Sequence, residues 1–321
     1  MHYDVFNGDA DGIIALIQIR LATPMQSTLI TGVKRDIKLL EQVSCKTDAT
    51  SVTILDISME KNIEPLSQLL ERGVDVFYCD HHRTGGQIPD SNKLTTLIDL
   101  DAEICTSLLI NKHLNGQFAT WAIAAAFGDN LFDSAYALAQ EVGLCKNDTE
   151  FLKELGTLIN YNGYGASLSD LHIPPKDLYQ ELFKFSCPLE LRNEKSSPYY
   201  VLKEGYNSDY HNISALVPIF DTDKARVFEL PCQPWARRIS GVFGNELANQ
   251  QPNKAHAVLT LNSNLEEYTV SVRSPLENRI GADDICTKFP SGGGRKAAAG
   301  INSLPKDRKQ TFLETLDCYY R

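Results

Sequence analysis

The first 80 residues alternate short apolar runs with longer segments of helical period, and this alternation strongly constrains the fold. The short runs, which read as strands, are residues 3–6, 27–31, 52–55 and 74–79. The segments of helical period between them are residues 13–21, 35–43 and 62–72. Strands that alternate with helices in this way predict an α/β domain with a doubly wound parallel sheet, covered by helices on both faces.

Acidic and histidine side chains follow three of these strands, at the point where each strand ends. They are Asp9 and Asp11, then Asp56, then Asp80, His81 and His82. Ligands of open parallel sheets bind beyond the carboxyl ends of the strands, so we expect these side chains to converge on one edge. Asp129 is a further candidate, because it lies in a break between the helical segments 119–127 and 131–142.

Taken singly, each of these residues has an ordinary structural explanation, such as an aspartate that caps the next helix. As a group they are a typical donor set for hard divalent cations, which prefer carboxylate oxygens, and imidazole suits Mn²⁺ better than Mg²⁺. Two such ions about 3.5–4 Å apart can clamp a phosphoryl group. The sequence therefore predicts a centre of two divalent ions.

The second half of the chain has a different organisation. A helix is expected at 235–249, strands at 255–261 and 267–273, a glycine-rich loop at 291–294, and a last helix after Pro305. Residues 186–198 are polar and contain two prolines, which indicates a connection. We divide the chain into a catalytic domain (1–190), a connection (191–229) and a smaller α/β substrate-binding domain (230–321), and expect the active site in the cleft between the domains.

The charge distribution limits the class of partner. Residues 1–220 contain 17 basic and 29 acidic side chains, and residues 221–321 contain 14 and 12. Such an acidic body argues against binding long nucleic acids, whose phosphates attract many lysines and arginines. No N-terminal signal or membrane-spanning run is visible, so we expect a cytoplasmic protein without a membrane partner.

Four sequence blocks together carry a family resemblance. They are Asp9-Ala10-Asp11-Gly12, Leu55-Asp56, Asp80-His81-His82 and Gly128-Asp129. In this order and at these separations they resemble the DHH phosphoesterases, which include single-strand exonucleases, nanoRNases and manganese pyrophosphatases. The run from Ser291 to Gly300 is similar to the glycine-rich motif of the C-terminal substrate domain associated with that family.

The resemblance implies a role for each residue. Asp9 and Asp11 would each bind one ion, Asp56 would bridge both, and His81 and Asp129 would complete the second site. Asp80 would orient the histidines, and His82 would face the scissile phosphate. The cofactor would be two Mn²⁺ ions, with Mg²⁺ or Co²⁺ as alternatives.

The substrate contacts implied by the resemblance lie near the C-terminus. They are Arg273, Ser274, Gly292, Gly293, Gly294 and Arg295. Two positions depart from the family pattern. Asn7 stands where many relatives carry an aspartate or have a histidine nearby, and Arg295 stands where the glycine motif usually ends in histidine. Because a guanidinium fits both a phosphate and the O6 and N7 edge of guanine, Arg295 favours guanine-containing substrates.

The sequence thus predicts a two-metal phosphodiesterase that hydrolyses short oligonucleotides, above all linear dinucleotides such as pGpG. Three alternatives stay open: a phosphatase for 3′-phosphoadenosine 5′-phosphate, a single-strand exonuclease, and a nucleotide-binding sensor without catalysis. The oligomeric state is also open, with a homodimer among the alternatives.

Overall fold

The computed structural model describes residues 1–320, and the chain divides into two compact units. The first unit is Met1–Gly205 and the second begins at Tyr206, inside helix α9 (Pro198–His211). Within the described residues, no helix is both long enough and apolar enough to span a bilayer.

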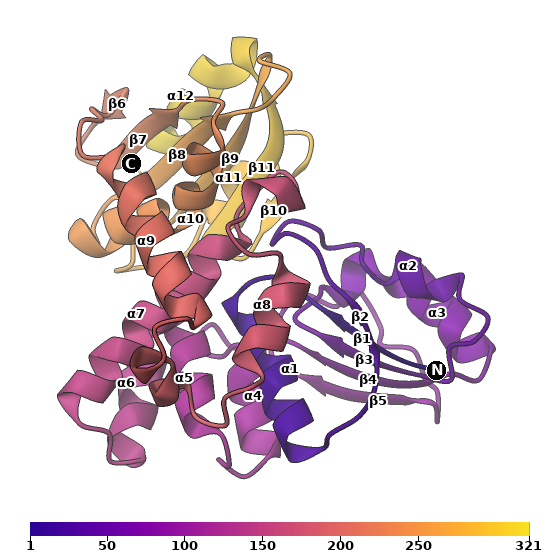
Figure 1. Ribbon diagram of the computed structural model, residues 1–321. Helices are drawn as coiled ribbons and strands as arrows, with labels where there is room; N and C mark the ends of the chain where they lie inside the picture. Colours follow the sequence, from indigo (N-terminus) through magenta and orange to yellow (C-terminus); the bar gives the residue numbers. More distant parts are fainter. Residues whose placement is uncertain (321) are drawn as a thin grey trace. The chain divides into compact units, whose positions relative to one another are not determined.

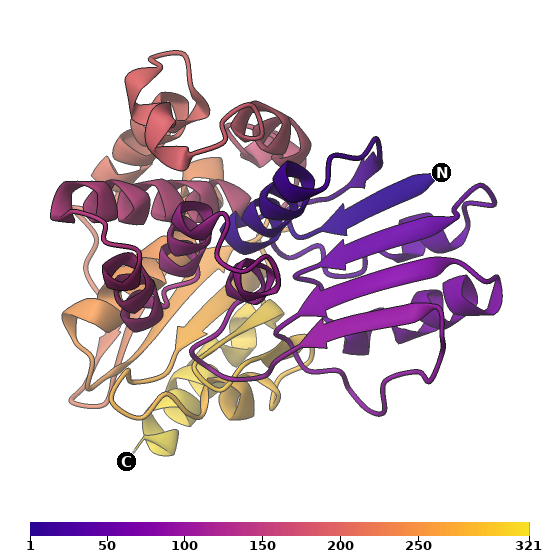
Figure 2. The ribbon, with the colours of Figure 1, turned by 90° about the horizontal axis from the view of Figure 1, so that it is seen from below.

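The first unit contains a five-stranded sheet in which every neighbouring pair is parallel. In spatial order the strands are β2 (Thr28–Ile30), β1 (His2–Phe6), β3 (Ser51–Leu55), β4 (Asp75–Asp80) and β5 (Leu94–Ile98). Their arrows, indigo to purple, point the same way in Figure 2. The predicted parallel sheet is confirmed. The edge strand β5 was not predicted, because its Leu-Thr-Thr-Leu-Ile sequence is short and partly exposed.

Helices cover both faces of this sheet (Figure 1). Tyr3 and Val5 of β1 pack with side chains of α2 (Glu41–Ser44) and α3 (Ile63–Glu71). On the opposite face, Asp4 pairs with Arg20 of α1 (Ala10–Ala22), and Phe6 contacts Tyr179 of α8 (Pro175–Leu182). The remaining helices of this unit are α4 (Thr106–His113), α5 (Ala119–Gly128), α6 (Phe132–Glu141) and α7 (Lys146–Gly163).

The predicted helix at 35–43 is wrong for most of its length, since only residues 41–44 form α2. Side chains bond to the backbone there in place of a helical ladder. Asp36 Oδ2 accepts from Val33 N, and the Asn62 amide bonds to Leu40 N and Ile37 O. Such local bonds compete with helix formation.

Two glycines let α5 approach both α7 and the start of α1. A Cβ added at Gly156 of α7 would lie 1.8 Å from the Ala124 carbonyl oxygen, and one added at Gly128 would lie 2.6 Å from Ala10 Cβ. The Gly128 contact brings Asp129, the next residue, beside the turn that carries Asp9 and Asp11.

The second unit contains a mixed six-stranded sheet. In spatial order the strands are β10 (Gly292–Gly294), β11 (Ala298–Pro305), β9 (Glu267–Arg273), β8 (Ala255–Leu261), β7 (Ala225–Leu230) and β6 (Phe220–Asp221). One face packs on α11 (Ala282–Cys286) and α12 (Lys309–Tyr319). The other face packs on α10 (Pro234–Gln250), where Phe243 meets Phe228 of β7.

Two sequence expectations differ from this arrangement. Residues 292–294, expected as a loop, form β10, because Gly293 pairs with Gly300 of β11 and the ladder supplies the hydrogen bonds. The segment 191–229, expected as a connection, contains α9, β6 and most of β7. Pro198 is the first residue of α9, a position where its missing N–H is no penalty.

The Gly156 contact yields a stability prediction. We expect Gly156→Ala to lower the free energy of unfolding by about 1–3 kcal/mol, because the added methyl must displace the Ala124 carbonyl. Urea denaturation measures this change. The matched control is Gly86→Ala, where nothing lies within 4 Å of the added Cβ and the change should stay within about 0.5 kcal/mol. Equal stabilities for the two variants would contradict the tight crossing.

Candidate metal centre

The centre of the candidate site is the pair formed by Asp56 and His81. Asp56 follows β3 and His81 follows β4, so parallel pairing of these strands brings the two residues together. His81 Nε2 lies 3.3 Å from Asp56 Oδ1 and 3.8 Å from Asp11 Oδ2. His81 Nδ1 lies 2.8 Å from the Ile104 carbonyl oxygen, which can only accept a hydrogen bond. Nδ1 therefore carries the ring proton. In the neutral ring, Nε2 has a lone pair and presents it to the carboxylates.

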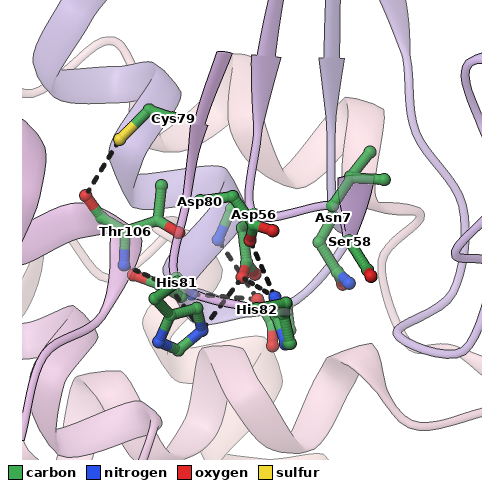
Figure 3. Close-up of polar contacts among 12 residues, drawn as sticks. Asn7, Asp56, Ser58, Cys79, Asp80, His81, His82 and Thr106 are labelled. Atoms are coloured by element: carbon green, nitrogen blue, oxygen red, sulfur yellow. Dashed lines mark hydrogen bonds and ion pairs between the residues drawn. The ribbon is translucent and has the colours of Figure 1, made fainter. Parts of the chain in front are cut away.

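His82 is oriented by a different partner. Its Nδ1 lies 2.7 Å from Asp80 Oδ1 and 3.7 Å from Asp56 Oδ1. Burial raises the pKa of Asp80, but His82 and His81 together lower it below its ordinary value. An ionised Asp80 can only accept a hydrogen bond, so His82 donates to it from Nδ1. The other ring nitrogen of His82, Nε2, does not contact Asp80. Figure 3 shows the Asp56 and Asp80 carboxylates beside both imidazole rings.

Asp11 is fixed from the opposite side by the start of α4. Its Oδ2 accepts from Thr106 N at 2.8 Å, and its Oδ1 accepts from Ser107 N at 2.7 Å. The Ser107 hydroxyl also donates to the Asp11 carbonyl oxygen at 2.8 Å. These bonds join the first turn of α1 to the first turn of α4, and they fix the orientation of the Asp11 carboxylate.

Asp9 caps α1 and also forms an ion pair. Its Oδ1 accepts from the backbone N–H groups of Asp11 and Gly12 at 3.0 and 3.1 Å. Its Oδ2 pairs with the Lys34 ammonium, which donates a further hydrogen bond to Asn160 Oδ1 at 3.0 Å. Asp9 is thus bonded through both carboxylate oxygens.

Burial and like charges govern the ionisation of this group. Burial, followed by the neighbouring carboxylates, raises the pKa of Asp56 well above its ordinary value. Burial, Asp129 and Asp9 raise the pKa of Asp11 to about 6. Burial also acts against ionisation of Asp9, yet Lys34 outweighs it and lowers the pKa of Asp9. Asp129, half-buried at the end of α5, therefore lies within electrostatic range of the whole group.

Asp56 carries two signs of local strain. Its backbone φ is +57°, a left-handed conformation that an aspartate adopts at a cost. Its Oδ1 is buried and has no hydrogen-bond partner within residues 1–320. A buried carboxylate oxygen without a donor is unfavourable unless a cation compensates it.

The donor geometry fits a divalent cation. Asp56, His81 and His82 each offer one ligand atom, and these atoms lie within 4.8 Å of one another. An octahedral ion with bonds of about 2.0–2.1 Å places neighbouring ligand atoms about 3 Å apart. The 3.3 Å between Asp56 Oδ1 and His81 Nε2 agrees with that spacing. Asp56 and His81 are therefore suited to hold one ion, and Asp11 Oδ2, 3.8 Å from His81 Nε2, is the next carboxylate oxygen beside them.

The residues expected to contact substrate lie in the second unit. Arg273, at the end of β9, donates from Nε to Asn245 Oδ1 at 2.5 Å and bonds to the Gly241 carbonyl oxygen at 3.3 Å. Ser274 is buried, and its N–H and hydroxyl both donate to the Ala297 carbonyl oxygen. Gly292, Gly293 and Gly294 form β10, and Arg295 N donates to Ala298 O in the turn that follows. Their contact with substrate stays a prediction.

Sequence reasoning missed two polar residues of the site, Lys34 and Asn160. A signal for Lys34 was present, because it comes shortly after the carboxyl end of β2, where the same parallel-sheet rule applies. Asn160 lies on the buried face of α7, and nothing in its sequence context distinguishes it from a packing residue.

The comparisons with known proteins identify the fold. No protein-family model and no curated protein matches the sequence. Among solved structures, a DHH-domain protein described as a member of the s1p family of ribosomal proteins has a TM-score of 0.66 and 14% identity, over 99% of this chain and 86% of that one. The exonuclease RecJ bound to manganese has a TM-score of 0.62 and 16% identity, over 99% and 89%.

A third structure, the pGpG-specific phosphodiesterase PggH from Vibrio cholerae, has a TM-score of 0.53 and 10% identity, over 100% and 99% of the two chains. Identities this low describe the fold alone. The chain therefore has the fold of DHH-domain proteins, and the family resemblance drawn from the four sequence blocks is confirmed at that level.

The raised pKa values predict how stability depends on pH. In metal-free protein, protonated Asp11 and Asp56 favour the folded state. This contribution is fully present below about pH 4 and is lost as the pH rises through about 6, the pKa of Asp11. For Asp11 it amounts to roughly 2–3 kcal/mol. Asp9 and Asp80, whose pKa values are lowered, change protonation below this window.

We therefore expect urea denaturation in EDTA to show wild type losing stability relative to Asp11→Asn between pH 4.5 and about 7. The amide change adds an offset that does not depend on pH, so the slope of the difference is the measurement. Excess Mn²⁺ should remove the decline in wild type. Parallel curves for the two proteins would show that Asp11 ionises normally.

Proposed function

We propose that the protein is a metal-dependent phosphodiesterase that hydrolyses short oligonucleotides, most specifically linear dinucleotides such as pGpG, to mononucleotides. The observation that carries the proposal is the contact between Asp56 Oδ1 and His81 Nε2. Two acceptor atoms face each other at 3.3 Å, and the oxygen is buried without a hydrogen-bond donor among residues 1–320. That arrangement is suited to a bound cation.

A divalent ion held by Asp11, Asp56 and His81 would polarise a phosphoryl oxygen and lower the pKa of a water molecule. We infer Mn²⁺ as the physiological ion, since a nitrogen donor in the set favours it over Mg²⁺. The sequence predicts two ions, and Asp9 and Asp129 are the carboxylates left as donors for a second one.

The chain's own residues would position the substrate phosphate. His82 is about one third exposed, and Asp80 fixes its ring through Nδ1. Nε2 of that ring is therefore available for a hydrogen bond with a phosphoryl oxygen or the leaving oxygen. Asp80 acts through His82, because its buried carboxylate contacts that ring rather than solvent. A fixed ring saves the entropy of orienting it during the reaction.

The preference for short substrates rests on charge and on the second unit. The acidic first unit offers few cations for a long phosphate backbone. In the second unit, the glycines of β10 carry no side chains that would keep an anion from the backbone, and Arg295 follows directly. The fold is shared with PggH, a pGpG-specific phosphodiesterase, and this supports guanine dinucleotides as substrates.

A single-strand exonuclease is the second candidate, because RecJ has a higher TM-score than PggH. The two candidates differ in what they do with a long strand.

Incubation with di- to decanucleotides and a 20-nucleotide strand in Mn²⁺, read by chromatography, separates them. Rapid turnover of dinucleotides with an intact 20-mer supports our proposal. Digestion of the 20-mer supports the exonuclease, and mononucleotide release from 3′-phosphoadenosine 5′-phosphate alone supports a phosphatase. Binding of pGpG without hydrolysis of any of these substrates supports a nucleotide sensor.

We expect Asp56→Asn to reduce dinucleotide turnover by at least about 100-fold, because it removes the carboxylate charge that faces His81 Nε2 at 3.3 Å. Asparagine tolerates the left-handed backbone, so the fold should survive, which circular dichroism checks. The matched control is Asp75→Asn, at the exposed start of β4, which should keep full activity. Retention of a tenth of wild-type activity by Asp56→Asn would contradict its role.

The base preference has a separate test. If the Arg295 guanidinium recognises guanine, Arg295→His should lower the ratio of pGpG to pApA turnover by about 10-fold or more. Turnover of both dinucleotides by wild type and variant gives that ratio. An unchanged ratio would remove the guanine contact and leave the phosphodiesterase activity in place.

A further inference from the structure

Lys34 places a half-buried cation beside Asp9 in the candidate metal centre. Its ammonium pairs with Asp9 Oδ2 and donates to Asn160 Oδ1 at 3.0 Å. It also lies 5.3 Å from the ring centre of Tyr164, at the distance of a cation–π contact. The Lys34 side chain is 22% exposed and that of Asp9 only 4%. The positive charge is therefore largely shielded from water and directed at one of the expected metal ligands.

The backbone of Lys34 is fixed as well. Its N–H donates to the Gly163 carbonyl oxygen at 2.8 Å, at the end of α7. Its own carbonyl oxygen accepts from Asn7 Nδ2 at 3.2 Å, at the end of β1. Bonds at both ends of the residue limit how far the side chain can move away from Asp9.

We propose that the Lys34 ammonium takes the place of the second cation, so that the centre holds one tightly bound divalent ion instead of two. The inference rests on the proposed function, since it concerns the same site. It replaces the two-ion expectation with a centre of one metal ion and one fixed ammonium.

The charges around Asp9 support this assignment. One ion at Asp11, Asp56 and His81 would meet two carboxylates, which balance its charge. A second ion near Asp9 and Asp129 would have to share the Asp9 carboxylate with the Lys34 ammonium, which repels it. Asn7, which follows β1, is neutral and does not lessen that repulsion.

Metal stoichiometry tests the proposal without reference to activity. Full-length, metal-free protein is titrated with MnCl₂ at neutral pH by calorimetry, and electron paramagnetic resonance distinguishes isolated from spin-coupled Mn²⁺. Wild type should bind one ion tightly and show an isolated-ion spectrum, with any second ion at least about 100-fold weaker. Lys34→Met keeps the length of the side chain and removes its charge, so the second ion should then bind within about 10-fold of the first and give a coupled spectrum.

Two variants control for the substitution. Lys34→Arg keeps the charge and should still bind one ion. Lys38→Met removes a lysine nearby in the chain whose side chain is 66% exposed, and it should also bind one ion. Thermal melts check that each variant folds. If Lys34→Met is unfolded, Lys34→Gln takes its place with the same expectation.

The outcomes separate this inference from the proposed function. Two tightly bound ions in wild type, or a single ion in folded Lys34→Met, would overturn the role of Lys34. Two ions in a wild type that hydrolyses dinucleotides would leave the proposed function intact. One ion in wild type without hydrolysis of any nucleotide would support Lys34 and overturn the function instead. No Mn²⁺ binding at all would overturn both.

Discussion

Repulsion among buried carboxylates is the constraint on which the rest of this site depends. Asp9, Asp11 and Asp56 share one buried edge of the sheet, and burial alone makes their ionisation unfavourable. The fold compensates two of them with fixed donors. Backbone N–H groups at the start of α4 bond to Asp11, and those of the first turn of α1, together with Lys34, bond to Asp9. Within residues 1–320, Oδ1 of Asp56 has no comparable partner, so burial and the neighbouring carboxylates keep the pKa of Asp56 well above its ordinary value.

The parallel topology explains why these residues meet at all. Strands β1, β3 and β4 run in the same direction, so the residues that follow them share one edge. The helices α1 and α4 begin at that edge, and their free N–H groups and dipoles favour negative charge. The glycine contacts of α5 with α1 and α7 add Asp129 from a third direction. Backbone geometry thus fixes the charges before any ion binds.

Side chains of the second unit are also held in place by contacts within that unit. Arg273 is bonded to α10 through Asn245 and Gly241, which restricts the rotamers that a flexible arginine otherwise samples. Ser274 bonds to the Ala297 carbonyl oxygen, which fixes the backbone after β9. Groups that are already ordered lose less entropy when a ligand binds. The glycines of β10 leave this edge of the sheet without side chains.

The sequence by itself determined the parallel α/β unit and the set of acidic and histidine residues at its edge. Apolar strands have a strong local signal, and the chain direction fixes which residues follow them. Tertiary structure decided the rest. Gly292–Gly294 form a strand because they pair with β11. Side-chain hydrogen bonds replace the expected helix at residues 35–40. Lys34 pairs with Asp9, which lies 25 positions earlier in the sequence. These outcomes depend on partners distant in the chain, because a hydrogen bond or an ion pair forms only where the fold brings both groups together.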